Sequence, residues 1–200
     1  MENKTEILKI LKEIFDTNFA SNNNITDLAY ICPNDMKNLL MALYDYEDKT
    51  INDDIKLEIS RYIHKLEGED YLSYTPTVYG KILLDTVIRF KELKDVVEDE
   101  LLNFYIPFDA IIYLNDLFVI IFSSIGRYTY SEFIRKNYDF VKTIFNYMDS
   151  IYFSNKDISV AIITGFIEAF INRINYSELK SVLDIMPNNL KNYALAYKDK

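Results

Sequence analysis

The chain has 200 residues, half of them hydrophobic, and a formal net charge of -9. This composition allows a sizeable core, while an acidic surface repels phosphate backbones and anionic lipids, so direct binding to nucleic acid or to a membrane surface is disfavoured. Cys32 is the one cysteine, which excludes an intramolecular disulfide and fits a reducing compartment, so we expect a cytoplasmic protein.

Amphipathic patterns predict helices through most of the first half of the chain. Pro33 and Gly68 separate some of them, and GEDYLSYTPT (68–77) is the least regular segment. Pro76 weakens the one strand candidate, YLSYTPTVY (71–79), because proline cannot donate to a sheet. The helices expected here cover residues 3–20, 26–30, 35–47, 54–67, 78–90 and 92–105.

The most apolar stretch is PFDAIIYLNDLFVIIFSSIG (107–126), which predicts a central helix over 108–125. Asp109 can cap its start and Gly126 can end it. Apolar residues occupy both sides of this helix, so we expect it to be buried on nearly all sides. Asp116 interrupts the pattern; it either faces water, which we favour, or is buried against a cation or a tyrosine hydroxyl. The apolar residues are Ile111, Leu114, Phe118, Ile121 and Ile125 on one face and Ile112, Val119 and Ile120 on the other.

The second half of the chain also has helical patterns, of which residues 158–173 are strongly apolar. Ala161, Gly165 and Ala169 follow one another at helical spacing there, which permits close approach of another helix. We therefore predict an all-α fold of stacked antiparallel hairpins, a short solenoid or a bundle, around buried helices near 108–125 and 158–173. The helices expected after residue 126 cover 131–152, as two helices or one bent helix, 158–173, 176–185 and 189–198.

A weak internal repeat bears on the domain organisation. Residues 36–67 and 141–170 share one pattern, an apolar helix, a polar loop ending in Asn-x-Asp-Ile, and a second apolar helix. Such a pattern is typical of a helical hairpin used twice, and similar loop caps can also produce it by chance. We expect a single helical domain over residues 1–200, with two related halves, 1–104 and 105–200, as the alternative description.

The residue types that carry chemistry are sparse. A metal site or a nucleophilic site needs several suitable side chains that converge, and the sequence shows no such motif. His64 is the only histidine and is interpreted as an exposed or half-buried surface residue, while Cys32 is most simply a small buried hydrophobe. A nucleophilic pair of these two residues would require the fold to bring them together. We expect no enzymatic activity, no cofactor and no metal.

Tyrosines recur where predicted helices meet loops, beside acidic groups at 45–54, 67–70 and 92–100. Tyrosine offers a large contact area at low entropic cost, and carboxylates steer a basic partner. The first half therefore predicts a protein-binding surface, with ordinary solubilising charge as the alternative. We call its candidate residues the tyrosine–acid set: Tyr44, Tyr46, Glu47, Asp48, Glu69, Asp70, Tyr71 and Tyr74.

The second half carries a helix with the pattern Asp-Ile-x-x-Ala-Ile-x-x-Gly-Phe-x-Glu after a polar loop, and a final helix rich in Tyr and Ala. Over residues 85–200 the chain resembles a bacterial all-helical family of immunity-like proteins. The resemblance implies an intracellular domain that neutralises a cognate toxin by direct binding. The residues that match the pattern are Asp157, Ile158, Ala161, Ile162, Gly165, Phe166 and Glu168.

A second motif, Ser124-Ile125-Gly126-Arg127, resembles the Asn-Trp-Gly-Arg that borders the peptide groove of poxviral helical-bundle inhibitors of apoptosis and innate signalling. That resemblance implies a viral protein that binds host proteins. Three functions therefore stay open: an immunity protein that neutralises a basic toxin, which we favour, a viral inhibitor, and a small helical-repeat adaptor. All three bind protein, and none needs a cofactor.

Overall fold

The computed structural model describes residues 71–198 together with residues 43, 56–57, 59–61 and 63–64. This part of the chain is all-α, as predicted, and its only β contact is an isolated antiparallel bridge between Leu72 and Leu114. The described residues of the predicted helix 54–67 are helical. Apart from Leu43, the helices predicted between residues 3 and 47 lie outside the described residues. No helix in the described part combines the length and the apolar character that a membrane span requires.

The elements comprise α-helices, two 3-10 segments (η1 and η2) and a π-helical segment (η3). In chain order they are α5 (Val78–Arg89), η1 (Lys91–Leu93), α6 (Lys94–Leu102), η2 (Phe108–Tyr113), α7 (Phe118–Ile134), α8 (Tyr138–Ile151), α9 (Lys156–Val160), η3 (Ala161–Ile167), α10 (Glu168–Ile171), α11 (Tyr176–Ile185) and α12 (Asn188–Lys198). The elements α9, η3 and α10 follow without a break and form the helix predicted over 158–173. Five of the predicted helices, including 176–185 and 189–198, are confirmed to within a few residues.

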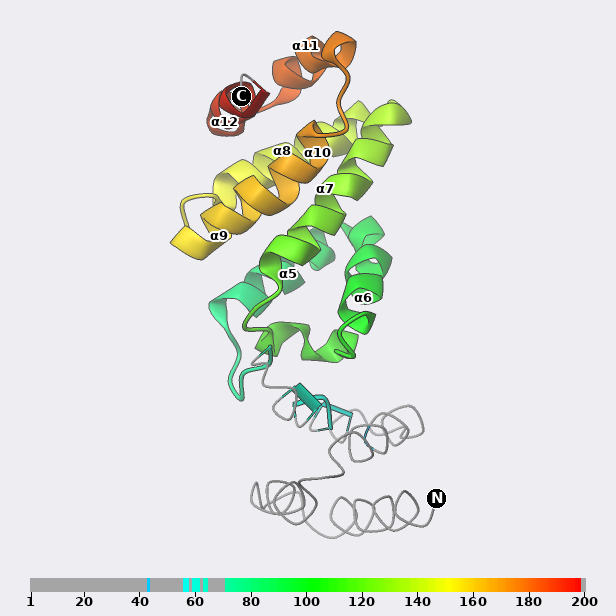
Figure 1. Cartoon of the computed structure of the whole chain (residues 1–200), viewed down its shortest axis with the longest axis vertical. Helices are drawn as coiled ribbons and strands as arrows, with labels where there is room; N and C mark the ends of the chain where they lie inside the picture. Colours follow the sequence, from blue (N-terminus) through cyan, green and yellow to red (C-terminus); the bar gives the residue numbers. More distant parts are fainter. Residues whose placement is uncertain (1–42, 44–55, 58, 62, 65–70, 199–200) are drawn as a thin grey trace, which may run out of the picture.

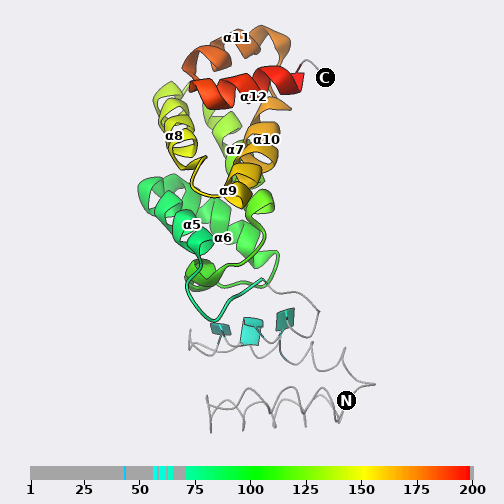
Figure 2. The ribbon, with the colours of Figure 1, turned by 90° about the vertical axis from the view of Figure 1, so that its left-hand side faces the viewer.

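The helix α7 is central to the described part (Figure 1). Figure 2 shows it between α8 and α10, with α11 and α12 across one end and α5 and α6 at the other. The predicted segment 131–152 is split between two helices, because α7 continues to Ile134 and α8 begins at Tyr138. Asn137 caps α8, and its side chain accepts a hydrogen bond from the Phe140 backbone N–H at 3.4 Å.

The core is centred where α7 packs against η3. Phe122 of α7 and Phe166 of η3 are fully buried. A Cβ atom at Gly165 would lie 2.6 Å from the Val119 carbonyl oxygen and 3.0 Å from the Phe122 Cβ atom, so only glycine fits this approach. The prediction that small residues of this helix permit close packing is thereby confirmed at Gly165.

The predicted limits of the central helix, 108–125, are wrong. Residues Phe108–Tyr113 form the 3-10 segment η2, and the backbone is extended at Leu114. The α-helix begins only at Phe118 and runs through Gly126 to Ile134, so Gly126 lies within the helix and does not end it.

Long-range backbone hydrogen bonds explain why the helix does not begin at residue 108. The Ser73 N–H donates to the Tyr113 carbonyl oxygen at 2.8 Å, and the Thr77 N–H donates to the Ile112 carbonyl oxygen at 3.0 Å. These carbonyl groups would accept intrahelical bonds in a continuous α-helix. Segment 71–77 therefore stabilises a different backbone conformation here.

The predicted burial is correct on one face of this segment and wrong on the other. The five residues of the first face are buried whether they lie in η2, in the connection or in α7. On the other face Ile112 is half-buried, but Val119 is 42% exposed and Ile120 is 39% exposed. The central helix thus presents apolar side chains to solvent, which the sequence pattern did not predict.

Candidate functional site

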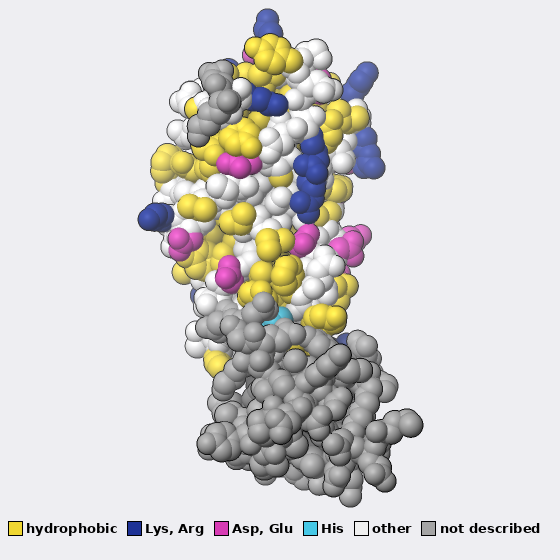
Figure 3. Space-filling model, viewed as in Figure 1, with side chains coloured by type: hydrophobic (Ala, Val, Ile, Leu, Met, Phe, Trp, Pro, Cys, Tyr) yellow, Lys and Arg dark blue, Asp and Glu magenta, His cyan; other side chains and the backbone are white. Residues whose placement is uncertain are grey.

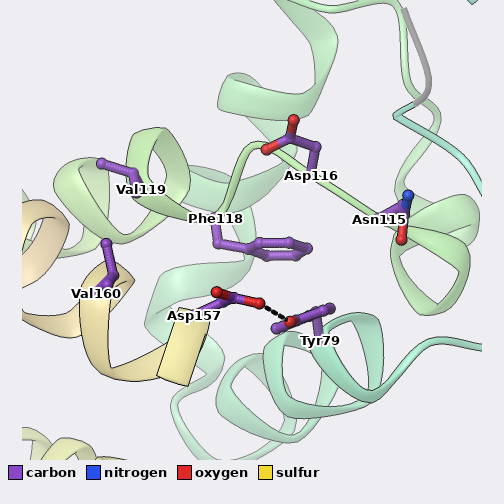
Figure 4. A pocket seen from close by; sticks show the side chains of 7 residues that line it. All are labelled: Tyr79, Asn115, Asp116, Phe118, Val119, Asp157 and Val160. Atoms are coloured by element: carbon purple, nitrogen blue, oxygen red, sulfur yellow. Dashed lines mark hydrogen bonds between the residues drawn. The ribbon is translucent and has the colours of Figure 1, made fainter. Parts of the chain in front are cut away.

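A pocket of about 350 Å³ opens at the N-terminal end of α7 (Figure 4). Its walls come from the start of α5, from the connection into α7 with the first residues of that helix, and from α9. The volume lies at the lower end of the range for ligand pockets, roughly 300–1,000 Å³. The lining residues are Tyr79, Asn115, Asp116, Phe118, Val119, Asp157 and Val160.

Tyr79 forms one wall and is held by both its ring and its hydroxyl. The ring stacks on Phe118, with centroids 4.5 Å apart and planes 26° from parallel. The hydroxyl donates a hydrogen bond to the Asp157 carboxylate, and the Asn155 Oδ1 atom lies 3.4 Å from it. The bond to Asp157 raises the pKa of the Tyr79 hydroxyl, because ionisation would place a second negative charge beside the carboxylate. Tyr79 therefore links α5 to α7 and α9.

The start of α5 is fixed against the connection before α7. Thr77 caps this helix: its Oγ1 atom accepts a hydrogen bond from the Gly80 N–H at 2.8 Å and donates one to the Leu114 carbonyl oxygen at 2.5 Å. A Cβ atom at Gly80 would lie 2.4 Å from the Ile111 carbonyl oxygen, so glycine allows the two backbones to meet. These contacts place Tyr79 at the pocket.

Asp116 lies directly before α7 and lines another part of the pocket. Leu117 has a φ of 71°, a left-handed conformation that costs a non-glycine residue roughly 1–2 kcal/mol. The Asp116 Oδ1 atom accepts a hydrogen bond from the Leu117 N–H at 2.7 Å and supports this turn. Asp116 is exposed, so it faces water as favoured from the sequence, although it precedes the helix. In Figure 4 it lies on the opposite side of the Phe118 ring from Asp157.

The pocket carries net negative charge. Asp116 and Asp157 are both exposed, and its seven lining residues include no lysine or arginine. Both aspartates lie at helix N-termini, each of which is equivalent to roughly +0.5 elementary charge. The two carboxylates therefore outweigh the two helix termini by roughly one charge. This electrostatic environment favours a cation.

Val119 and Val160 are exposed apolar residues of the pocket lining, and Ile120 follows Val119 along α7. Val119 and Ile120 on α7 are 42% and 39% exposed, and Val160 on α9 is 44% exposed. Figure 3 shows hydrophobic side chains gathered over the N-terminal half of α7, with acidic side chains on both sides. We call Asp116, Val119, Ile120, Asp157 and Val160 the α7 face. It combines apolar contact area with acidic groups.

Residues 85–199 match the model of a family described as a domain of unknown function (DUF7674). The chain belongs to this family. The DUF7674 segment covers nearly the same residues as the resemblance seen in the sequence, and its description ties the chain neither to immunity proteins nor to poxviral inhibitors. No curated protein and no solved structure matches the chain. All lining residues of the pocket lie within the DUF7674 segment except Tyr79, which precedes it.

The tyrosine–acid set is described only at Tyr71 and Tyr74, and neither lines the pocket. Tyr74 is 57% exposed, and the Arg61 guanidinium lies 5.1 Å from its ring centroid. Tyr71 is half-buried with its ring against His64, 4.9 Å between centroids. The remaining members lie outside the described residues, so the set stays a prediction: Tyr44, Tyr46, Glu47, Asp48, Glu69 and Asp70.

The interpretation of His64 as an exposed or half-buried surface residue is wrong, because its side chain is 2% exposed and packs against Tyr71. Cys32 lies outside the described residues. Within the predicted acidic group 92–100, Glu100 accepts hydrogen bonds from Ser124 and from Arg127 and so joins α6 to α7. Among the residues that the structure describes, no three His, Cys, Asp or Glu side chains are arranged to hold a metal ion.

The pocket itself is not predicted from the sequence. In the sequence, Asp157 indicates only the start of the apolar helix 158–173, and Tyr79 is one of many tyrosines near the ends of predicted helices. The local signal that points to the site is Asp116. Apart from Asp109 near its beginning, Asp116 is the one acid in the apolar stretch 107–126. The three residues come together only through the packing of α5, α7 and α9.

Proposed function

We propose that this chain is a non-enzymatic binding protein that neutralises a basic protein toxin by direct contact, as an immunity protein does, and that the toxin docks on the α7 face. The observation that supports it most strongly is the exposure of Val119 and Val160 in the lining of an acidic pocket, with the exposed Ile120 next to Val119 on α7. Apolar side chains that gather at one exposed place beside polar groups are typical of protein interaction sites.

Covering these side chains favours association. Full burial of a Val or Ile side chain stabilises by about 1.5–3 kcal/mol. A partner that covers one of these partly exposed side chains gains a share of this free energy in proportion to the exposed fraction. Val119, Ile120 and Val160 would then form the apolar centre of an interface, with Asp116 and Asp157 beside them. Such a centre provides affinity, and the acidic groups provide specificity and rate.

The α7 face is held rigidly, which lowers the entropic cost of binding. Val119 and Val160 belong to two helices that meet at the glycine contact of Gly165. The hydrogen bond from Tyr79 to Asp157 fixes the start of α9 from the other side. A partner therefore meets a surface whose backbone is already in place.

The charge of the chain suits a basic partner. The formal net charge is -9, and the pocket in the α7 face carries Asp116 and Asp157. A toxin that acts on nucleic acid needs a positive cleft to hold phosphate, and an acidic binding surface attracts such a cleft and speeds association. A basic nuclease is the toxin class that this charge pattern fits best.

The test is neutralisation in cells. The tagged chain is used to recover its partner from a lysate of the native host, and mass spectrometry identifies the partner. We expect the partner, expressed alone, to arrest growth and co-expression of the chain to restore it. A partner that is harmless when expressed alone would contradict neutralisation; a host signalling protein would favour the viral inhibitor, and a scaffold component the adaptor.

Two variants test whether the α7 face is the docking surface. Val119→Lys and Val160→Lys place a charge in its apolar centre, and we expect each to weaken toxin binding by about ten-fold or more and to reduce neutralisation. Ile88→Lys is the matched control, because Ile88 is also an exposed aliphatic residue on a helix, 62% exposed on α5. Equal effects at all three positions would place the docking surface elsewhere.

A further inference from the structure

We infer that the pocket at the start of α7 receives an arginine side chain of the partner. This assignment rests on the proposed function and names the group that the toxin inserts. The pocket combines carboxylates on different walls, an aromatic wall and an apolar border, and each of these features fits one part of an arginine side chain.

The carboxylates fit the guanidinium group. Asp116 and Asp157 line different parts of the pocket, on opposite sides of the Phe118 ring in Figure 4, so a guanidinium can donate to one carboxylate while the other adds to the negative potential. The guanidinium is planar, always charged and carries five N–H donors in a fixed fork, whereas the ammonium of lysine is a compact point charge. Because a guanidinium can donate to a carboxylate while its plane stacks on an aromatic ring, arginine fits this pocket better than lysine does.

The present hydrogen bonds leave acceptor capacity on both carboxylates. The Asp116 Oδ1 atom accepts from the Leu117 N–H, and the Asp157 Oδ2 atom accepts from the Tyr79 hydroxyl. An ionised carboxylate has two oxygens with about four acceptor positions, so each aspartate can serve its structural partner and a ligand together. Their present hydrogen bonds are therefore compatible with binding.

The aromatic and apolar walls fit the rest of the side chain. Tyr79 and Phe118, stacked on one another, both line the pocket and form an aromatic wall for a guanidinium. Val119 and Val160 line the pocket and are exposed, and they can contact the methylene groups of the arginine stem. The volume of about 350 Å³ accommodates a long side chain.

A titration of the full chain followed by amide NMR tests this assignment. The probes are N-acetyl-L-arginine methylamide, its lysine analogue and its norleucine analogue, which is of similar length but uncharged. We expect the arginine probe to shift the amides of Phe118, Val119 and Val160 most strongly, the lysine probe less, and the norleucine probe least. Shifts of equal size from arginine and norleucine, or none from arginine at these amides, would overturn the assignment.

Charge-neutral variants keep a side-chain oxygen that can accept the structural hydrogen bond and remove the negative charge that binding requires. Asp116→Asn combined with Asp157→Asn should abolish the shifts from the arginine probe and weaken toxin binding by about ten-fold or more. Asp139→Asn is the matched control, because Asp139 is an exposed acid near a helix start too, in the first turn of α8, and we expect it to change neither. Melting temperatures of all variants identify any loss caused by unfolding.

The outcomes distinguish this assignment from the proposed function. If the partner is toxic and the double variant neutralises it as well as the unmodified chain does, the arginine assignment is wrong and the function stands. If the arginine probe binds in the pocket and the partner is harmless, the toxin proposal is wrong and the specificity of the pocket for a guanidinium stands.

Discussion

Gly126 of α7 lies directly against the backbone of Phe166 in η3: a Cβ atom at Gly126 would stand 2.3 Å from the Phe166 carbonyl oxygen. The same pair of elements meets again at Gly165, where the added atom would stand 2.6 Å from the Val119 carbonyl oxygen. The two glycines therefore set the distance between α7 and the helix that carries Asp157 and Val160. The geometry of the α7 face depends on this distance.

Gly126→Ala should lower the free energy of unfolding by about 1–3 kcal/mol, because the methyl group meets fixed backbone and the helices must separate. In an unconstrained helix the same change would be stabilising by roughly 0.5–1 kcal/mol, so the sign itself is informative. Urea denaturation followed by circular dichroism measures it. Asn146→Ala, at an exposed position of α8, is the control and should not destabilise. A Gly126→Ala variant as stable as the unmodified chain would contradict the close approach.

Tyr147 should make the stability depend on alkaline pH. Burial raises the pKa of its hydroxyl to about 12, and this hydroxyl donates to Asp85 at 3.0 Å. The unfolded chain loses this proton near pH 10, roughly the ordinary value for tyrosine, while the folded chain retains it. The stabilisation that the protonated Tyr147 hydroxyl contributes to the folded state is therefore complete below about pH 10, and it is lost as the pH rises toward about 12.

The matching variant is Tyr147→Phe, which should show a smaller decline of unfolding free energy above about pH 10 than the unmodified chain. At neutral pH it should also be less stable by about 0.5–1.5 kcal/mol through loss of the hydrogen bond. Urea denaturation at a series of pH values measures both effects. Tyr176→Phe, at a side chain 91% exposed, controls for loss of a tyrosine hydroxyl. Parallel pH profiles for Tyr147→Phe and the unmodified chain would count against this account.

Glu132 joins the end of α7 to the start of α8. Glu132 is 7% exposed. Its carboxylate accepts hydrogen bonds from the Asn137 side chain at 2.8 Å and from the Arg135 side chain at 2.7 Å. The hydrogen bond from Asn137, followed by Arg135, lowers the pKa of Glu132 in spite of its burial. The resulting stability is present above the unfolded pKa of about 4.3 and is lost as the pH falls.

Asn137→Ala should lower the free energy of unfolding by about 1–3 kcal/mol, because Asn137 both caps α8 and satisfies Glu132. Arg135→Ala should cost less, about 0–1 kcal/mol, since the Arg135 side chain is 69% exposed and its ion pair is screened by water. Denaturation at neutral pH compares the two variants. Equal losses would show that the cap and the amide contact contribute little beyond the ion pair.

Two acidic regions compete as the docking surface, and charge reversal separates them. Asp116→Lys with Asp157→Lys should slow association with the identified toxin by about ten-fold or more at low salt and weaken its salt dependence. Reversal of four members of the tyrosine–acid set, Glu47, Asp48, Glu69 and Asp70, should have the smaller effect per charge. Stopped-flow association rates at several salt concentrations give the comparison. The opposite ranking would indicate that the partner docks on the tyrosine–acid set instead of the α7 face.

The helices with clear caps and amphipathic patterns were determined by the sequence alone. Asn155 precedes α9 and its side chain accepts a hydrogen bond from the Asp157 N–H at 2.7 Å, and Asn175 and Glu178 form a capping box at the start of α11. Capping and apolar spacing act within a few residues, so they can be recognised without knowledge of the fold. The all-α class follows from the same local signals.

Only the tertiary structure decided the conformation of residues 108–117 and the exposure of Val119. The apolar spacing there fits a buried helix, but segment 71–77 pairs with this backbone and α7 begins only at Phe118. The pocket likewise requires α5, α7 and α9 to meet. Contacts between residues distant in sequence determine both features, and local propensity carries no information about such contacts.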